Sequence, residues 1–493
     1  MCVNGNLLDF EEKIDQSTRI LVVNPLNTIW SYQQTIEVAL RAIHRKSHVE
    51  YLNVGYSMPS RYEGNSKQHL SLFKNRYMPN RVDRILKKFG AVSVKPSFNI
   101  KFLFDTPKFD SIIDLKKYTY DEHPIGAMVF SAIASTLEST SFELHEVSDY
   151  VKLYFAIAQN SYLQISNSLK NSSFNFIFTT NDRLIGSAMA LSFAKKKSIE
   201  FRVFYYGNNP NFINEHKGSL YDYSNWKKDI ALFWDTHPPD KQELSKIEST
   251  IAELKYQPSS NSFPFLKLQT SGQGIEKRNK TVVFYATSEH EHSPNHEIVR
   301  NLNGFPNQYT AFVELYAICN KLGYDLILKY HPKRNGEVAK SSEVFERLDW
   351  LNIVKGMRIT EIMANSNIDT YKLMSQADFN VVWSSTVGIE CIIREFPVIV
   401  IGDIHWLSTS WGIHAWDTVK LEHLMTHGVN LLPNSALFLW FNFKRNFGNC
   451  YKYVQSEQGK LLLERKFYPE FRIIIRILKR IKIFLKESIS FGE

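Results

Sequence analysis

Short apolar runs alternate with segments of helical periodicity in two separate parts of the chain. In the first part, the pattern predicts strands at 19–25, 174–180 and 200–205, with helices at 32–43, 127–137, 148–169 and 184–194. In the second part, it predicts strands at 281–286, 325–330, 379–383 and 398–401, with helices at 309–322, 370–375 and 386–394. Strands that alternate with helices form parallel sheets covered on both faces. The sequence therefore predicts an α/β fold of two doubly wound units.

Changes in composition suggest where these units begin and end. Residues 51–107 are aromatic and basic with little periodicity, and we interpret them as an insertion. Residues 257–280 are rich in Ser, Gly and Pro, which is typical of a linker. We therefore expect an N-terminal domain at 1–256, a C-terminal domain at 281–445 and a helical tail at 446–493.

The bulk composition excludes several classes of protein. At 493 residues and 44% hydrophobic content, the chain is too long for one hydrophobic core. Its four cysteines are far apart and have no Cys-x-x-Cys spacing, which argues against a disulfide framework or a zinc site. The N-terminus has no secretory pattern, and no apolar run approaches the roughly 20 residues that span a bilayer. We expect a cytoplasmic protein.

The net charge of +9 is concentrated near the C-terminus. Residues 465–486 hold eight Lys or Arg against Glu470 alone, so they carry seven of the nine excess charges. This distribution argues against a nucleic-acid groove in the body of the protein. Residues 471–486 form a basic amphipathic pattern that can bind an anionic membrane surface peripherally, and packing of its isoleucines on the protein itself is the competing interpretation.

Polar residues follow two predicted strands of the second unit, at the edge where parallel sheets bind phosphates. An imidazole at His331, beside lysines, can donate to a phosphate and offset its charge. The hydroxyls of Ser384, Ser385 and Thr386 precede a predicted helix, where they can bind an anion or simply cap the helix. The predicted donor-binding residues are Lys329, His331, Pro332, Lys333, Ser384, Ser385, Thr386, Gly388 and Glu390.

The first unit offers a candidate general base. Asp182 follows the strand at 174–180 and could accept a proton from an acceptor hydroxyl, although helix capping or pairing with Arg183 would also explain it. Glu215, His216 and Asp222 are further candidates. The predicted catalytic residues are Asp182 and His331, and the acceptor-side residues are Asn181, Gly207, Asn208 and Asp222.

A cluster of imidazoles and carboxylates at 289–292 raises the question of a metal. Alternating residues in a loop do not fix a coordination geometry, and no His-Glu-x-x-His helix or Asp-x-Asp motif is present. We expect no metal and no cofactor, and a polar loop that lines the cleft between the domains.

The chain resembles a known family from about residue 174 onward. Leu328–Pro332 and Val381–Glu390, with its continuation to Val400, are similar to bacterial capsule and surface-polysaccharide glycosyltransferases of the GT-B fold. That group includes Kdo transferases and is similar to bacterial sialyltransferases with His-Pro and Ser/Thr motifs. The resemblance implies two Rossmann-like domains facing a central cleft, with the acceptor on the N-terminal side. It also implies that His331, Pro332 and Ser384 to Thr386 hold the monophosphate of a CMP-sugar.

A weaker match lies at 205–210 and 217–225. The family has an acidic residue before a glycine in this loop, whereas this chain has Tyr206 before Gly207. We therefore predict a glycosyltransferase that uses a nucleotide-sugar, with a CMP-sugar favoured, and a glycan or glycolipid acceptor. The alternatives are a CDP-glycerol type polyol-phosphate transferase, a nucleotide-sugar epimerase and a non-catalytic peripheral membrane adaptor.

Overall fold

The computed structural model describes a large part of the chain. The described residues are 9–26, 28–56, 82, 86–94, 106–137, 139–140, 142–205, 213–223, 228, 240–242, 245, 249, 273–276, 279–292, 304–331, 349–363, 366–385, 387–404, 413–429, 451, 454–457 and 460–463. Five predicted site residues lie outside them: Gly207, Asn208, Pro332, Lys333 and Thr386. The basic segment 471–486 also lies outside them.

The first sheet has six strands in the order β3-β2-β1-β4-β5-β6. Its strands are β1 (Arg19–Leu26), β2 (His48–Tyr56), β3 (Val92–Val94), β4 (Phe176–Thr180), β5 (Glu200–Tyr205) and β6 (Asn214–Lys217). All pairs are parallel except β5 with β6. One face is covered by α1 (Asp9–Lys13) and α2 (Ile29–His44), and the other by α7 (Ser148–Asn171) and α8 (Ile185–Lys197). Two further helices lie outside these: α6 (Ile125–Leu137) packs against α7 and α8, and α5 (Ile112–Lys117) packs against α6.

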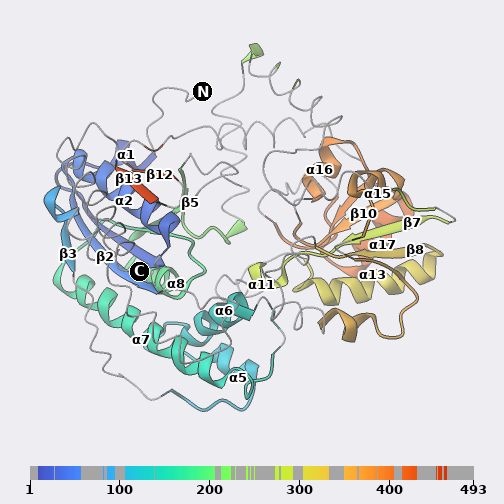
Figure 1. Ribbon diagram of the computed structural model, residues 1–493, viewed down its shortest axis with the longest axis horizontal. Coiled ribbons are helices and arrows are strands. Elements are labelled where there is room, and N and C mark those ends of the chain that lie inside the picture. Colours follow the sequence, from blue (N-terminus) through green and yellow to red (C-terminus); the bar gives the residue numbers. More distant parts are fainter. Residues whose placement is uncertain are drawn as a thin grey trace, which may run out of the picture.

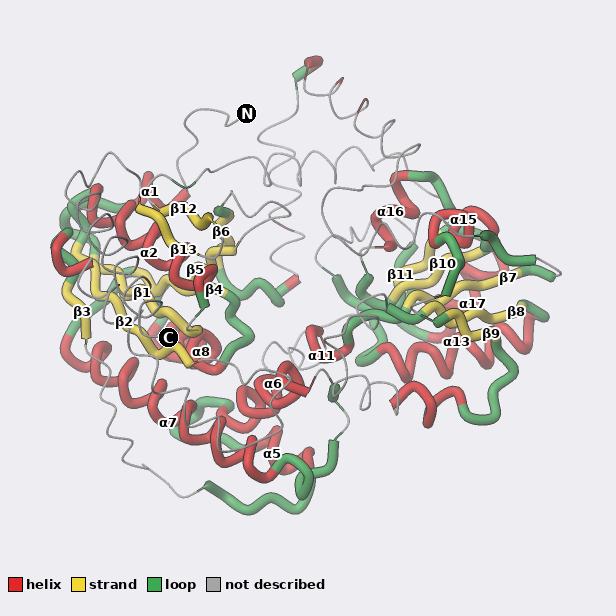
Figure 2. The backbone as a smooth tube through the Cα atoms, viewed as in Figure 1, coloured by secondary structure: helices red, strands yellow, loops and turns green. Residues whose placement is uncertain are grey.

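The second sheet has five parallel strands in the order β11-β10-β7-β8-β9. Its strands are β7 (Thr281–Tyr285), β8 (Asp325–Lys329), β9 (Thr360–Ile362), β10 (Phe379–Val382) and β11 (Val398–Val400). The core on one face includes α13 (Gln308–Leu322) and α17 (Thr418–His427), and the core on the other includes α15 (Thr370–Gln376) and α16 (Val387–Ile393). Figure 2 shows the strands of each sheet with helices beside them.

Both sheets share one topology. Numbered within each unit, the five parallel strands run 3-2-1-4-5, which is the order of a Rossmann-like fold. The order reverses between β1 and β4 in the first sheet and between β7 and β10 in the second. Ligands of such sheets bind outside the carboxyl ends of the strands at this switch point. The prediction of an α/β fold with doubly wound parallel sheets is confirmed.

Local sequence explains where these elements begin. The central strands β1 and β7 are buried nearly along their whole length, as expected for strands covered on both faces. Asn307, Asp369 and Asp417 cap α13, α15 and α17, because each side chain accepts a hydrogen bond from a backbone N–H of the first turn. Gly323 ends α13 with a φ of 74°, a conformation that glycine adopts without steric cost.

Several elements differ from the predicted pattern. The segment interpreted as an insertion contributes part of β2 and all of β3 to the first sheet. Glu50 and Asn53 interrupt the apolar pattern of β2, but Arg19 lies 3.7 Å from Glu50 and Asn24 donates to Asn53 over 2.9 Å. Part of the segment expected as a helical tail forms an antiparallel hairpin of β12 (Val454–Glu457) and β13 (Lys460–Leu463).

The two halves contact each other at several places. Ser139, just beyond α6, donates to Asp349 Oδ2 over 3.0 Å, and Tyr309 donates to the same oxygen over 3.3 Å. The short helix α11 (Glu289–His292) contacts α6 (Figure 1). The hairpin of β12 and β13 contacts α2, and Tyr451 belongs to the core on that face of the first sheet. The chain beyond the second sheet therefore returns to the first. No helix among the described ranges is long and apolar enough to cross a membrane.

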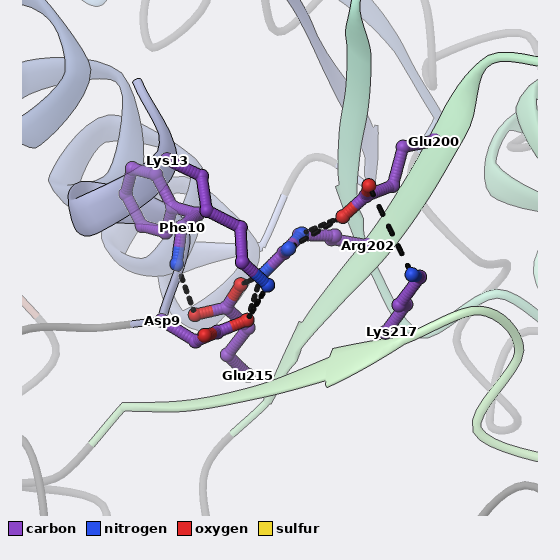
Figure 3. A network of polar contacts seen from close by, with 7 residues as sticks. All are labelled: Asp9, Phe10, Lys13, Glu200, Arg202, Glu215 and Lys217. Carbon is purple, nitrogen blue, oxygen red and sulfur yellow. Dashed lines mark hydrogen bonds and ion pairs between the residues drawn. The ribbon is translucent and has the colours of Figure 1, made fainter. Parts of the chain in front are cut away.

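A buried arginine joins α1 to the edge of the first sheet (Figure 3). Arg202, on β5, is 1% exposed and donates to Asp9, Glu200 and Glu215. Its guanidinium also lies 5.6 Å from the centre of the Phe176 ring. Burial alone would lower the pKa of Arg202, but the surrounding carboxylates raise it. Glu215, a sequence candidate for a general base, is therefore paired with Arg202 in this cluster.

Candidate functional site

The two sequence motifs of the second unit reach the same edge of the sheet. Lys329 ends β8 and pairs in register with Tyr285 of β7, while Val382 of β10 pairs with Tyr285 from the other side. His331 and Ser384 therefore leave strands on either side of β7, about 10 Å apart by strand spacing. This edge is the switch point where a doubly wound sheet binds its ligand.

The adjacent serines Ser384 and Ser385 have different environments. Ser385 Oγ accepts a hydrogen bond from Val387 N over 3.3 Å, and Ser385 O accepts one from Gly388 N over 3.1 Å. Capping therefore accounts for Ser385, and the N–H of Gly388 is not available to an anion. Ser384 is 5% exposed, and its hydroxyl has no hydrogen-bond partner among the described residues. A buried hydroxyl without a partner is costly, so Ser384 is the residue of this motif that is suited to a ligand.

Lys329 supplies a buried cation beside this edge. Its side chain is 4% exposed, and Nζ donates to Met363 O over 3.4 Å. Burial lowers the pKa of Lys329 to about 8 because desolvation penalises the ammonium form. His331 is partly exposed and lies two residues beyond it. A phosphate at this edge would compensate the charge of Lys329.

Glu390 contributes to packing between two helices. Its carboxylate lies 3.8 Å from Arg394 Nη1, and the Arg394 guanidinium lies 4.3 Å from the centre of the Tyr371 ring. Burial raises the pKa of Glu390, while hydrogen bonding to Tyr371 and the charge of Arg394 oppose the rise. These contacts tie α16 to α15, which gives Glu390 a structural explanation.

The segment after β7 differs from the polar loop predicted there, because residues 289–292 form the helical turn α11. Gln308 holds this segment through two hydrogen bonds with Thr287, each 3.0 Å long. Thr287 N donates to Gln308 Oε1, and Gln308 Nε2 donates to Thr287 O. Gln308 N also donates to Glu289 over 3.3 Å. Within the described ranges, no group of three or more His, Cys, Asp or Glu residues could hold a metal ion. Sequence reasoning missed Gln308, which lies within an ordinary amphipathic helix.

Asp182 occupies the equivalent edge of the first sheet. It lies two residues beyond the end of β4, after Asn181, whose φ of 47° is left-handed. Asp182 is 1% exposed, and its Oδ2 accepts a hydrogen bond from Leu220 N over 3.1 Å. Burial raises the pKa of Asp182 to about 6, although Ser219 and Leu220 oppose the rise. The helix that follows, α8, begins without a side-chain cap, so capping does not account for Asp182.

Asp182 and Ser384 hold the same topological position. Each follows the fourth strand of its unit, and each lies two residues beyond that strand's last residue. Each is buried, and within the described ranges each has a side-chain oxygen without a hydrogen-bond partner: Oδ1 of Asp182 and Oγ of Ser384. The two residues therefore match in position, in burial and in this oxygen.

Tyr223 connects the edges of the two sheets electrostatically. This side chain is buried, and burial raises the pKa of its phenol. The negative charges of Asp403, which follows β11, and Asp182, which follows β4, raise that pKa further. Both carboxylates therefore act on one phenol, although they come from different sheets. Sequence reasoning missed Tyr223 and Asp403. The neighbouring residue Asp222, predicted on the acceptor side, lies in a turn in which its backbone N–H donates to Ser219 O over 3.2 Å.

No family model matches this chain, and no curated protein sequence matches it. Among solved structures, the chain is similar to the β-Kdo 2,7 transferase of Thermosulfurimonas dismutans KpsC, with 12% identity, 62% of this chain and 87% of that chain covered, and a TM-score of 0.35. The β-Kdo 2,4 transferase of the same protein is 10% identical, with a TM-score of 0.34, and the match covers 59% of this chain and 85% of that chain.

A UDP-GlcNAc 2-epimerase from Neisseria meningitidis is also similar, with 10% identity, coverage of 87% of this chain and 100% of that chain, and a TM-score of 0.26. Scores at this level establish neither a family nor an activity for this chain.

Proposed function

We propose that this protein is a glycosyltransferase that moves a sugar from a nucleotide-activated donor to a glycan or glycolipid acceptor. The donor phosphate would bind at the switch point of the second sheet, within the domain 281–445. The acceptor would bind at the switch point of the first sheet, within the domain 1–256. The observation that carries the proposal is the matched placement of Asp182 and Ser384, each buried with an unpaired oxygen.

On the donor side, three groups are suited to a nucleotide phosphate. The Ser384 hydroxyl is free to donate, and the Lys329 ammonium supplies a positive charge whose burial makes an anionic partner favourable. His331, beyond the same strand, can donate to the departing phosphate. The His-Pro and Ser/Thr motifs favour a CMP-linked acidic sugar as the donor.

On the acceptor side, Asp182 would act as the general base. A carboxyl with a pKa of about 6 is ionised at neutral pH and is more basic than an exposed carboxylate. Asp182 Oδ1 would take the proton of the acceptor hydroxyl while that oxygen forms a bond to the anomeric carbon. The bond from the anomeric carbon to the donor phosphate breaks, and its electron pair leaves with the nucleotide. This displacement inverts the anomeric configuration.

Nucleotide binding gives the first test. We expect one of CMP, CDP or UDP to raise the melting temperature, since a ligand at one hundred times its Kd adds about 2.7 kcal/mol of stability. Ser384→Ala should keep the fold, because its hydroxyl has no partner to lose, and should reduce the ligand-induced shift. Ser375→Ala is the matched control, because Ser375 is an exposed serine on α15. The donor site is refuted if no nucleotide changes melting, or if Ser384→Ala responds like wild type.

Transfer itself gives the second test. Wild-type protein incubated with CMP-Kdo or CMP-sialic acid should release CMP faster when a glycan acceptor is present. Asp182→Asn should lower the acceptor-dependent rate about 10²- to 10⁴-fold while nucleotide binding persists. A variant that transfers at the wild-type rate would exclude Asp182 as the base.

A further inference from the structure

A serine and a histidine meet in a cavity outside the site described above. The cavity has a volume of about 400 Å³ and lies against α8, and the segment before α6 provides the rest of its lining. Ser192 Oγ lies 2.7 Å from His123 Nδ1, and both residues line the cavity. Neither residue belongs to the proposed donor or acceptor site.

The environment of His123 favours the neutral imidazole. The ring is 1% exposed and packs against Phe193, with the ring centres 4.2 Å apart. Burial lowers the pKa of His123, and the charge of Lys196 lowers it further, while Asp121 and Glu122 oppose both effects. A neutral ring whose Nδ1 accepts from Ser192 carries its proton on Nε2. This arrangement leaves Nδ1 able to take the serine proton.

The other ring nitrogen faces a carboxylate at a longer distance. Nε2 is buried, has no hydrogen-bond partner in the part of the chain that the structure describes, and lies 4.0 Å from Asp121 Oδ2. Asp121 is itself held by Tyr162, which donates over 2.8 Å, and by Lys196, which donates over 3.0 Å. The negative charge of Asp121 would stabilise the imidazolium that forms when His123 takes a proton.

The turn that presents His123 is conformationally unusual. Asp121 and Glu122 both have positive φ, 47° and 66°, in a turn closed by reciprocal backbone bonds between Tyr120 and His123. Consecutive non-glycine residues in this region are strained, and such strain is concentrated at functional sites. This turn places the His123 imidazole 2.7 Å from Ser192.

The lining of the cavity indicates the class of substrate. Pro124, Ala188 and Leu191 form an apolar part that suits a short acyl chain. Lys195 lines the same cavity one helical turn beyond Ser192 and places positive charge near the point where an oxyanion would develop. Lys196 also lines the cavity but is paired with Asp121 and Glu122. The cavity volume suits a compact molecule.

We propose that Ser192 and His123 form a nucleophilic dyad that cleaves small O-acyl esters. Ser192 Oγ would form a bond to the ester carbonyl carbon while its proton moves to His123 Nδ1. The bond from that carbon to the alcohol oxygen breaks, and the alcohol leaves with this proton. Water then attacks the acyl-serine, His123 takes a proton from the water and returns it to Ser192, and a carboxylic acid is released. This activity is separate from the proposed glycosyl transfer.

Covalent labelling tests the proposal directly. The full chain is incubated with diisopropyl fluorophosphate, and intact mass and peptide mapping are recorded. We expect one adduct per chain on Ser192, and no adduct on Ser192→Ala. Ser375→Ala, which removes an exposed serine on α15, should label like wild type. An unlabelled wild type with an intact circular dichroism spectrum, or an adduct that persists in Ser192→Ala, overturns the proposal.

Hydrolysis of p-nitrophenyl acetate provides the second readout. Wild type should hydrolyse it above the rate of Ser192→Ala, and His123→Gln should lower the labelling rate about 100-fold or more. His123 is buried, so the melting temperature of His123→Gln is measured first. If that variant is unfolded, Asp121→Asn replaces it, with a smaller decrease in labelling rate expected. A folded variant of His123 that labels at the wild-type rate, or equal ester hydrolysis by wild type and Ser192→Ala, refutes the dyad.

Discussion

Replacing Asp182 with asparagine should stabilise the protein at neutral pH. The substitution keeps the shape of the side chain, and the amide oxygen can still accept the hydrogen bond from Leu220 N. It removes the buried negative charge. Because Asp182 is 1% exposed, its carboxylate receives little stabilisation from water. The variant therefore separates the cost of the buried charge from the packing of the site.

The magnitude follows from the shift in pKa. Burial raises the pKa of Asp182 from 3.8 to about 6, and each unit corresponds to about 1.4 kcal/mol. The folded state therefore binds the proton more tightly than the unfolded state, so stability falls as pH rises from 3.8 towards 6. Well above pH 6, ionisation of Asp182 lowers the free energy of unfolding by about 3 kcal/mol, and at pH 5 it lowers it by about half of this.

Denaturant unfolding at pH 5 and pH 8 measures this cost. The free energy of unfolding of Asp182→Asn relative to wild type should increase by about 1.4 kcal/mol between the two pH values. Asp110→Asn is the control, because it makes the same replacement at an exposed position. A difference between Asp182→Asn and wild type that is the same at pH 5 and pH 8 would refute the reasoning.

Two further substitutions test buried charges elsewhere. Arg202→Met should lower the free energy of unfolding by about 3–5 kcal/mol, because it leaves the buried carboxylate of Glu215 without its cation. The double variant Arg202→Met with Glu215→Gln should recover much of this loss, and denaturant unfolding measures both. Lys329→Met should stabilise the protein at pH 7 by up to about 3 kcal/mol, because burial lowers the pKa of Lys329 from 10.5 to about 8. Wild-type stability should rise with pH between these values, so the advantage of Lys329→Met should shrink from pH 7 to pH 10. An advantage independent of pH would contradict this assignment.

The sequence predicted the central strands because their burial requires continuous apolar runs. The segments Ile20 to Val23 and Val282 to Tyr285 are buried on both faces of their sheets, so no polar residue can interrupt them without a partner. Helix starts were also predictable within a few residues, because capping side chains such as Asn307 and Asp369 precede them.

Strands that contain polar residues could not be found in this way. In β2, Glu50 and Asn53 are compatible with a buried sheet because partners such as Arg19 and Asn24 lie beside them on β1. Those partners are about thirty residues away in the chain, and no local pattern links them. The strands β6 and β9 consist mostly of polar residues, so neither gives the apolar run that identified the equally short β11.

The places of the candidate residues at strand ends were predictable from the sequence, whereas their environments were not. The motifs at Lys329 and Ser384 were found because polar residues follow apolar strands. The distinction between Ser384, which has no partner, and Ser385, which caps α16, depends on a rotamer and on the first turn of the helix. Likewise, burial raises the pKa of Asp182, and Leu220, which donates to its carboxylate and opposes the rise, lies 38 residues away in the sequence.

Burial acts in opposite directions on the two charged groups at the switch points. It raises the pKa of Asp182 to about 6 and lowers the pKa of Lys329 to about 8, so both groups are charged at neutral pH in spite of desolvation. A carboxylate that is costly to ionise is a better base for a hydroxyl proton. An ammonium that is costly to bury gains more from a phosphate than an exposed lysine would. The energetic cost at each edge thus matches the step proposed there, proton removal at the first sheet and phosphate binding at the second.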